Sequence, residues 1–587
     1  MADRLKGWLA TARTGWRQDR AYLTAQALIV LFGVVLRLLG YLTTPSGLWM
    51  DEAGWAKKLI TKSVLEHRFR PVGFMWLEKQ LVELFAPNEF WLRFVSVGAS
   101  LLALFLVPYV VAQLIKSRFA RLVVLFLFAA HPALIDLAKE FKPYSLEVLM
   151  HLGAIALYLR YRQTGRALYF GLFLASLPLA LLFAYNMTLA WPGLLLLALY
   201  QAHKKWRWRG VAAVVSTGAV CAALLGGIYF AFLRGVTSSR TETYWANKYD
   251  VFYHQSLPRS KKLQNAAIAE KKKQAEADSE EGEGEGDEED EPAPVKLEQP
   301  GRVAWTLEKY NDIAALPGLR RQLWRVPSAL PAWFAAHLGT IERGFWIALH
   351  FFALGMLAYR RRFEDLILLF LPLALVVVLN LFGQWPIGAF RTNLYLCTYS
   401  LIIAGVAIDF IATTAIRTYA LAGTIALLTV LPGFAFGFDW HRRKHIWTRQ
   451  QYAREILEEL RDLRQAQLRK DPKSKPAPLV LDPQTFQSQN FYLDVVPDTK
   501  EEYRRFFKKH FKQENWWGFQ RRLERDLPKK LKAGAPVWMV ISKQQTMITT
   551  KKFLNQRATI LMEKSIGDDN DHLILLVGER TEPHAQP

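Results

Sequence analysis

Long apolar stretches alternate with short polar ones over the first three quarters of the chain. Stretches of about 17 to 25 apolar residues, the length at which a helix crosses a bilayer, recur up to about Phe436. We therefore predict a polytopic α-helical membrane protein with about eleven spans. They begin near Tyr22, Trp91, Leu122, Tyr144, Leu168, Thr188, Val211, Phe334, Leu366, Leu394 and Tyr419.

The pattern changes after Trp440. Residues 452–468 place apolar side chains at helical spacing among many charges, and short β-type runs follow. These runs are 478–481, 536–541 and 573–577. The tail contains no glycine-rich nucleotide loop and no Cys/His metal spacing. The predicted parts are an amphipathic cytoplasmic N-terminus (1–21), a membrane domain (22–439) and a soluble α/β domain (440–587).

Two long loops interrupt the membrane domain, a first outer loop at 43–90 and a second at 234–333. The second contains 278–291, which is nearly all Glu, Asp and Gly. Such a run cannot bury a core and is predicted to be disordered. A calcium loop would need a defined spacing of oxygen ligands, which the run lacks. A solvated insert is the favoured interpretation.

Charge supplies an orientation for the spans. The net charge of +23 is concentrated in short loops between apolar stretches, as the positive-inside rule predicts, so anionic lipid is favoured over nucleic acid as a partner. Counting spans then places the Asp51-Glu52 pair, the turn at Glu140, the loop at Arg391 and the tail together on the non-cytoplasmic face. If the spans near Leu168 and Thr188 form one broken span, every later assignment inverts. Both cysteines lie in apolar stretches, which excludes a disulfide framework.

Asp51 and Glu52 are adjacent carboxylates directly after the first span, where unpaired charge is costly and usually serves chemistry, binding or topology. One carboxylate could accept a proton as a general base while the other holds a metal or an acceptor. The alternative is a pair of helix N-terminal residues, because carboxylates favour that position. The two interpretations are compatible.

Other polar motifs lie at predicted span ends. Glu140 and Lys142 precede a helix opened by Pro143, and Glu147 follows one turn inside the membrane, where it could equally hydrogen-bond a neighbouring helix. Arg391 ends a Gly/Pro-broken loop and could contact a phosphate or anchor topology. Two further segments have alternative interpretations: residues 67–71 as an interfacial segment or a phosphate site, and Glu89 with Arg93 as an i,i+4 ion pair.

Three motifs together resemble the GT-C superfamily of polytopic glycosyltransferases, in particular its bacterial branch related to protein O-mannosyltransferases and lipid A aminoarabinose transferases. The pair Asp51-Glu52 is similar to the Asp-Glu motif of the first loop. Residues 140–146 resemble a Glu-x-Arg-x-Tyr motif, with Lys142 in place of arginine and Tyr144 retained. Residues 385–391 resemble a Tyr-Pro-Phe-Gly-x-x-Arg loop. Residues 67–72 depart from the usual Lys-Pro-Pro stretch, and the acidic insert has no counterpart.

The resemblance implies an inverting glycosyltransferase of the bacterial inner membrane that uses a polyprenyl-phosphate sugar donor on the non-cytoplasmic face. It implies Asp51 as the base, Glu52 and Glu140 as acceptor or metal contacts, and Lys142 and Arg391 as donor-phosphate contacts. Tyr144 and Arg70 are added as substrate-binding candidates. A divalent cation is the one cofactor it admits, with Glu52 and Glu140 as candidate ligands.

The sugar and the acceptor, whether lipid, glycan or protein, are not specified by the sequence. The alternative function is a transporter or flippase of a lipid-linked or anionic solute. Transporters often show internal repeats and charges near the bilayer midplane, whereas this chain shows no repeat and its charges lie at span ends. A noncatalytic assembly protein is the third possibility, and the set of candidate site residues disfavours it.

Overall fold

The structure is a computed structural model. It describes residues 20–39, 41–42, 48, 50–63, 70–85, 87–233, 332–381, 393–414, 423, 453–472, 477–481, 507–508, 527, 531, 536–542, 550, 554, 558–566 and 572–578. The predicted span near Tyr419, the acidic insert at 278–291 and the loop carrying Arg391 lie outside them.

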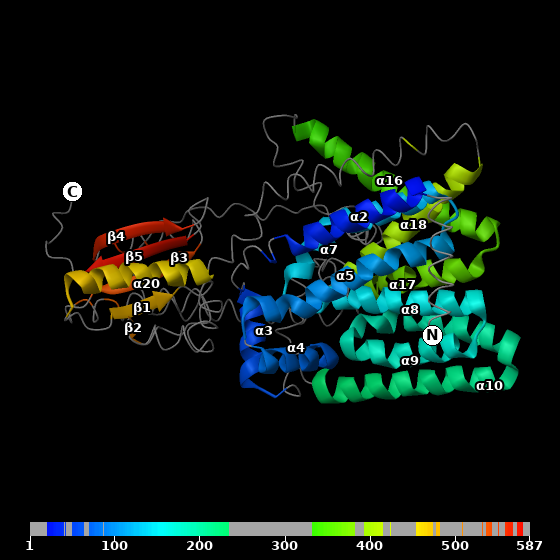
Figure 1. The fold of residues 1–587 in the computed structure, drawn as a ribbon, viewed down its shortest axis with the longest axis horizontal. Helices are drawn as coiled ribbons and strands as arrows, with labels where there is room; N and C mark the ends of the chain where they lie inside the picture. Colours follow the sequence, from blue (N-terminus) through cyan, green and yellow to red (C-terminus); the bar gives the residue numbers. More distant parts are fainter. Residues whose placement is uncertain are drawn as a thin grey trace, which may run out of the picture.

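Long helices occupy the positions that hydropathy predicts, and most of them run along one direction as a bundle (Figure 1). They are α2 (Arg20–Leu38), α5 (Glu89–Leu114), α6 (Arg118–Ala130), α8 (Tyr144–Thr164), α9 (Ala167–Phe183), α10 (Trp191–Ile228), α16 (Ala332–Tyr359), α17 (Phe363–Leu381) and α18 (Leu394–Thr414). Shorter elements link them. They are α3 (Met50–Thr61), α4 (Val72–Leu84), α7 (Pro132–Asp136), the 3-10 turns η2 (Leu137–Lys139) and η3 (Tyr185–Leu189), and the π-helical η4 (Tyr229–Leu233).

By length and apolar composition, four helices of the described residues could cross a membrane: α2, α5, α10 and α18. The bent pair of 118–130 and 133–139 would be a fifth. This number is lower than the predicted count of about eleven. One reason is that α9 has only 17 residues. A second reason is that α10 is counted once.

Helix α10 is two antiparallel segments rather than one straight rod. Arg207 has non-helical backbone angles, φ 48° and ψ −136°. A Cβ added at Gly218 would lie 3.8 Å from Leu195 Cδ1, although a straight helix would separate these residues by roughly 35 Å at about 1.5 Å per residue. The chain therefore folds back at Arg207, as two predicted spans starting near Thr188 and Val211 require.

Helices α9 and α10 also run in opposite directions. Lys205 Nζ donates to Gly165 O at 2.6 Å, and Trp206 Nε1 donates to Tyr161 Oη at 3.1 Å. These contacts bring the end of the first α10 segment beside the start of α9. The two apolar stretches are therefore a hairpin that reverses at η3, and the interpretation as one broken span is excluded.

The buried residue Arg37 explains how α2 holds the break between α6 and α7. Pro132 starts α7 and ends the hydrogen-bonding of α6, so the last α6 carbonyls lack helical partners. Arg37 donates to Ala129 O at 2.9 Å and Phe128 O at 3.1 Å, and to Ser100 Oγ on α5 at 2.8 Å. One guanidinium thus joins three helices.

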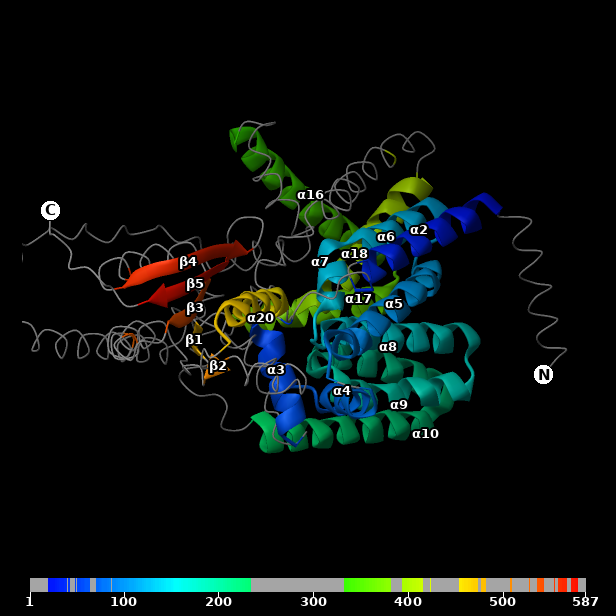
Figure 2. The same ribbon diagram turned by 60° about the vertical axis from the view of Figure 1, so that its left-hand side comes forward.

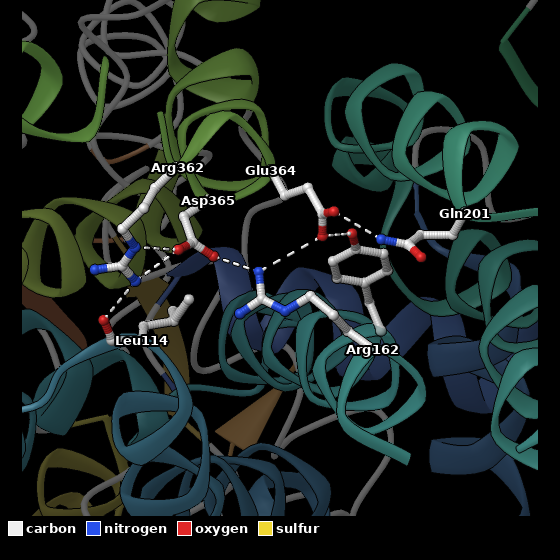
Figure 3. Close-up of polar contacts among 7 residues, drawn as sticks. Leu114, Arg162, Gln201, Arg362, Glu364 and Asp365 are labelled. Carbon is white, nitrogen blue, oxygen red and sulfur yellow. Dashed lines mark hydrogen bonds and ion pairs between the residues drawn. The ribbon is translucent and has the colours of Figure 1, made fainter. Parts of the chain in front are cut away.

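An ionic cluster ties four helices at the bundle end that carries the basic loops (Figure 3). Asp365 accepts from Arg162 at 2.5 Å and from Arg362 Nε at 2.6 Å, and Arg362 also donates to Leu114 O at 2.8 Å. Glu364 accepts from two further side chains at 2.9 and 2.7 Å. The cluster consists of Leu114, Tyr158, Arg162, Gln201, Arg362, Glu364 and Asp365. Four of the basic loops that the sequence predicts on one side of the membrane therefore meet at this cluster.

The tail contains a five-stranded sheet of order β2-β1-β3-β5-β4. Its strands are β1 (Ala477–Leu481), β2 (Phe507–Lys508), β3 (Val537–Ser542), β4 (Thr559–Ile566) and β5 (His572–Gly578). β1 pairs in parallel with β2 and β3, whereas β5 pairs antiparallel with β3 and β4. The three predicted β-type runs are thus confirmed as β1, β3 and β5. The sequence interpretation missed β2 and β4.

Both faces of the central strand β3 are buried. Along β3, Trp538 and Val540 enter one hydrophobic cluster while Met539 and Ile541 enter another, as the two-residue period of a strand dictates. The first cluster also contains Ile456, Leu457 and Leu460 of α20 (Ala453–Lys470) and residues of α3, α4 and α5. Figures 1 and 2 show α20 and the sheet at the bundle end where α3 lies. The described part of the tail therefore packs against α3, α4 and the start of α5.

Candidate active site

The candidate site begins at the first turn of α3, which contains Asp51 and Glu52. Glu52 is fully buried and forms a two-pronged ion pair with Arg93 of α5. Arg93 Nε donates to Oε1 at 3.0 Å, and Nη2 donates to Oε2 at 2.7 Å. The pair fixes the start of α3 against the bundle, so the backbone at Asp51 is held in place as well.

The turn before α8 joins this pair. The Phe141 amide donates to Glu52 Oε1 at 2.5 Å, and Ser96 Oγ of α5 donates to Lys142 O at 2.6 Å. Glu140 and Lys142 are both buried, at 5% and 4% exposure. The structure therefore brings the Asp51-Glu52 segment and the Glu140 turn together, as span counting predicted. Arg391, the third polar feature in that prediction, lies outside the described residues.

Trp55 of α3 gathers cationic side chains at the same place. The centroid of its ring lies 4.2 Å from Arg70 Cζ and 3.9 Å from Lys142 Nζ, and cations at such distances are attracted by the indole face. Arg70 Nη1 also donates to Trp55 O at 3.4 Å. Burial, followed by the charges of Arg70 and Lys62, lowers the pKa of Lys58 on the same helix. Positive charge therefore collects around Trp55, an arrangement that favours an anionic ligand.

Several predicted residues take roles that the sequence did not specify. Arg93 pairs with Glu52, a partner that the sequence interpretation did not name, and the local ion pair of Glu89 with Arg93 stays a prediction. Arg70 is 7% exposed, so it is buried in the protein and does not lie on the surface as an interfacial segment would. Tyr144 is half-buried as the first residue of α8, directly after Pro143, which occupies the helix N-cap position.

Trp55 and Ser96 were not among the predicted site residues. Trp55 lies three positions after Glu52, on the same face of a helix, and this spacing was the one available signal. Ser96 lies three positions after Arg93 on α5, but a serine in an apolar helix gives no signal by itself.

Glu147 lies deeper in the bundle and is also buried. It accepts a hydrogen bond from Asn186 Nδ2 at 2.8 Å. The interpretation that it bonds a neighbouring element is therefore confirmed.

No group of three or more His, Cys, Asp or Glu side chains among the described residues is placed to hold a metal ion. Both oxygens of Glu52 are engaged by Arg93, so a cation would have to compete with a guanidinium for the same carboxylate. Glu52 therefore does not fit the metal-ligand role that the resemblance admitted.

No protein-family model matches the chain, and no curated protein matches it at a significant level. Among solved structures, ArnT from Cupriavidus metallidurans bound to undecaprenyl phosphate is similar at 12% identity, over 96% of this chain and 98% of that one, with a TM-score of 0.47. Its apo state gives 13% identity over the same shares of the two chains, with a TM-score of 0.49.

The oligosaccharyltransferase of Archaeoglobus fulgidus in complex with Zn and sulfate is similar at 14% identity, over 80% of this chain and 61% of that one, with a TM-score of 0.43. ArnT and this oligosaccharyltransferase are members of the GT-C superfamily that the motifs resemble.

Proposed function

We propose that the protein is a membrane glycosyltransferase that moves a sugar from a polyprenyl-phosphate donor to an acceptor on the non-cytoplasmic face. Asp51 accepts the proton of an acceptor hydroxyl or amine. The deprotonated acceptor attacks the anomeric carbon, the bond from that carbon to the phosphate oxygen breaks, and polyprenyl phosphate leaves. The step inverts the anomeric configuration because it is a single displacement.

The cations around Trp55 have a defined role in this reaction. Negative charge develops on the leaving phosphate, and preorganised cations in a site with little water stabilise it most strongly. Lys142 and Arg70 meet this need, since both are buried and held by backbone contacts. Arg391 is proposed to add a bidentate phosphate contact.

One observation carries the proposal: Glu52 joins three segments far apart in the sequence. Its bonds to Arg93 and to the Phe141 amide hold α3, α5 and the Glu140 turn together. A carboxylate proposed as a base thus lies on the same short segment as an anchor, next to cations suited to phosphate. If Asp51 and Glu52 served only as N-terminal residues of α3, the bonds from Glu52 to two other segments would not be needed.

Turnover by purified protein in nanodiscs tests the proposal. A radiolabelled polyprenyl-phosphate sugar and an extract of envelope lipids and glycans would be supplied, and labelled product would be measured. Asp51→Asn keeps size and shape but removes the proton acceptor, so turnover should fall by about two to four orders of magnitude. Melting temperature provides the folding control.

Wild-type turnover by a well-folded Asp51→Asn protein would eliminate Asp51 as the base. Movement of an intact lipid-linked sugar across vesicle membranes, without transfer to any acceptor, would instead favour the transporter alternative.

A further inference from the structure

A buried chain of hydrogen bonds lies in the bundle directly behind the candidate site. Asn186 of η3 donates to Glu147 at 2.8 Å, and its Oδ1 lies 3.3 Å from His151 Nε2. His151 Nδ1 lies 3.0 Å from Tyr399 Oη. Because all four side chains are at least 92% buried, the chain joins α8, η3 and α18 with little access to water.

The donor and the acceptor of each of these hydrogen bonds follow from the chemistry of the side chains. The amide nitrogen of Asn186 faces Glu147, so its oxygen faces His151 and must accept from Nε2–H. A neutral imidazole then has Nδ1 as an acceptor, and Tyr399 donates to it. The ring of Tyr395 stacks on His151 with centroids 4.4 Å apart. Both ends of the Asn186 amide are thus bonded to side chains of α8, which ties η3 to that helix.

The neighbouring residue of η3 transmits that orientation to the site. Tyr185 Oη donates to Arg70 O at 2.8 Å, and Arg70 is the residue whose guanidinium lies over Trp55. Arg70 borders residues 64–69 of the first outer loop, which are outside the described residues. The bond from Tyr185 is therefore a direct link between the bundle and the part of the loop that presents Arg70.

We propose that Tyr185 and Asn186 are positioning residues for the phosphate-binding cation Arg70. The polar chain fixes η3, and η3 fixes the backbone from which Arg70 reaches Trp55. This inference rests on the proposed function, because Arg70 is assigned there to the leaving phosphate. It adds a requirement: donor binding depends on a turn that does not itself contact the donor.

Two tyrosine-to-phenylalanine variants distinguish positioning of Arg70 from general stabilisation of the fold. Tyr185→Phe removes the hydroxyl that reaches Arg70. Tyr158→Phe removes a comparable hydroxyl, bonded to Glu364 at 2.9 Å in the cluster of Figure 3. Both variants lose one partly buried hydrogen bond, but only the first bond touches the candidate site.

Two measurements apply to the purified full-length protein in nanodiscs. The first is the affinity for undecaprenyl phosphate. The second is kcat and KM for a polyprenyl-phosphate sugar. Tyr185→Phe should weaken binding and raise KM by about threefold to tenfold, the effect of one neutral hydrogen bond, with kcat within about twofold. Tyr158→Phe should change neither value. Asn186→Ser should act in the same way as Tyr185→Phe, and it serves as the second variant if Tyr185→Phe is poorly folded.

Wild-type affinity and KM in both Tyr185→Phe and Asn186→Ser would overturn the positioning role while leaving the proposed function intact. Equal losses in Tyr158→Phe and Tyr185→Phe would also overturn it, because the effect would then be general stability. If the wild-type protein itself fails to bind undecaprenyl phosphate, the proposed function fails first.

Discussion

At the scale of single residues, substitutions of the neighbours Glu52 and Asp51 should affect different properties. A change at Glu52 should lower stability, whereas a change at Asp51 should lower turnover. Removing one partner of a buried ion pair leaves an uncompensated charge and costs about 3 to 5 kcal/mol. We therefore expect Glu52→Gln, which removes the negative charge that Glu52 places against Arg93, to lower the melting temperature strongly. Asp51→Asn should not.

The double variant Glu52→Gln/Arg93→Met provides the control for this prediction. It removes both charges and should recover part of the lost stability, as measured by thermal unfolding in detergent. A double variant less stable than Glu52→Gln alone would contradict the role of Arg93 as the counter-charge.

Glu78 on α4 makes stability depend on pH. It is fully buried, and neither carboxyl oxygen has a hydrogen-bond partner among the described residues, so burial raises its pKa well above the ordinary value. The unfolded chain ionises it near pH 4.3, whereas the folded chain keeps it protonated to higher pH. The contribution of Glu78 to the free energy of unfolding is thus fully present below the pKa of the unfolded chain. It is lost as pH rises through the pKa of the folded chain.

The corresponding variant is Glu78→Gln, which cannot ionise. Its melting temperature relative to wild type should increase between pH 5 and pH 8, as measured by thermal unfolding in detergent across that range. A difference that stays constant with pH would mean that the folded and unfolded chains ionise Glu78 equally over that interval.

Some of the site residues could be predicted from the sequence, and others could not. Asp51, Glu140 and Lys142 could be selected because rare charges beside apolar spans are visible in the sequence. The pairing of Glu52 with Arg93 could not, because the two residues are 41 positions apart and only tertiary packing brings them together. The same holds for Tyr185 and Arg70, which are 115 residues apart.

At the scale of elements, the loop between α8 and α9 depends on one glycine. Gly165 ends α8 with φ +62°, and an added Cβ would lie 1.8 Å from Lys205 Nζ. Left-handed backbone is costly for other residues. We expect Gly165→Ala to destabilise the protein by about 1 kcal/mol and to weaken the Lys205 contact.

Gly171 in α9 is the matched control, since a Cβ there meets nothing within 4 Å. Gly171→Ala should be neutral or stabilising, because alanine is the better helix former. Thermal unfolding of the two variants side by side measures the difference. Equal melting temperatures would show that the Gly165 backbone relaxes without cost.

Helix positions could be predicted because a bilayer-crossing helix needs a long apolar run, and such runs stand out. The strand β4 could not, since charged residues such as Glu563 and Lys564 interrupt it and its register shifts between Ile560 and Met562. It is an edge strand of the sheet, and edge strands tolerate charges and bulges.

At the scale of the whole molecule, the tail should lie outside the cytoplasm. It packs with α3 and α4 in one hydrophobic cluster, while the basic loops meet at the cluster that contains Asp365 (Figure 3). The native cysteines are both buried. We therefore expect Leu561→Cys, at a position 55% exposed, to react with an impermeant maleimide in intact cells.

Lys204→Cys, at an exposed position of α10 just before its reversal at Arg207, is the comparison and should react only after permeabilisation. The reverse pattern would show that the basic loops face outward, and the proposed face of the reaction would then be wrong.

Helix α18 is the most enclosed of the candidate spans, with 94% of its apolar window buried, and it contacts α6, α8, α16 and α17. It also follows all of these in the order of synthesis. Until Leu394 to Thr414 emerge from the ribosome, His151 lacks Tyr399, and the amides of Lys116 and Ser117 lack Asp409. Until α18 is synthesised, the earlier helices therefore lie in the bilayer without the helix on which they pack. Chains that terminate before Leu394 should be removed by membrane proteases rather than accumulate as stable fragments.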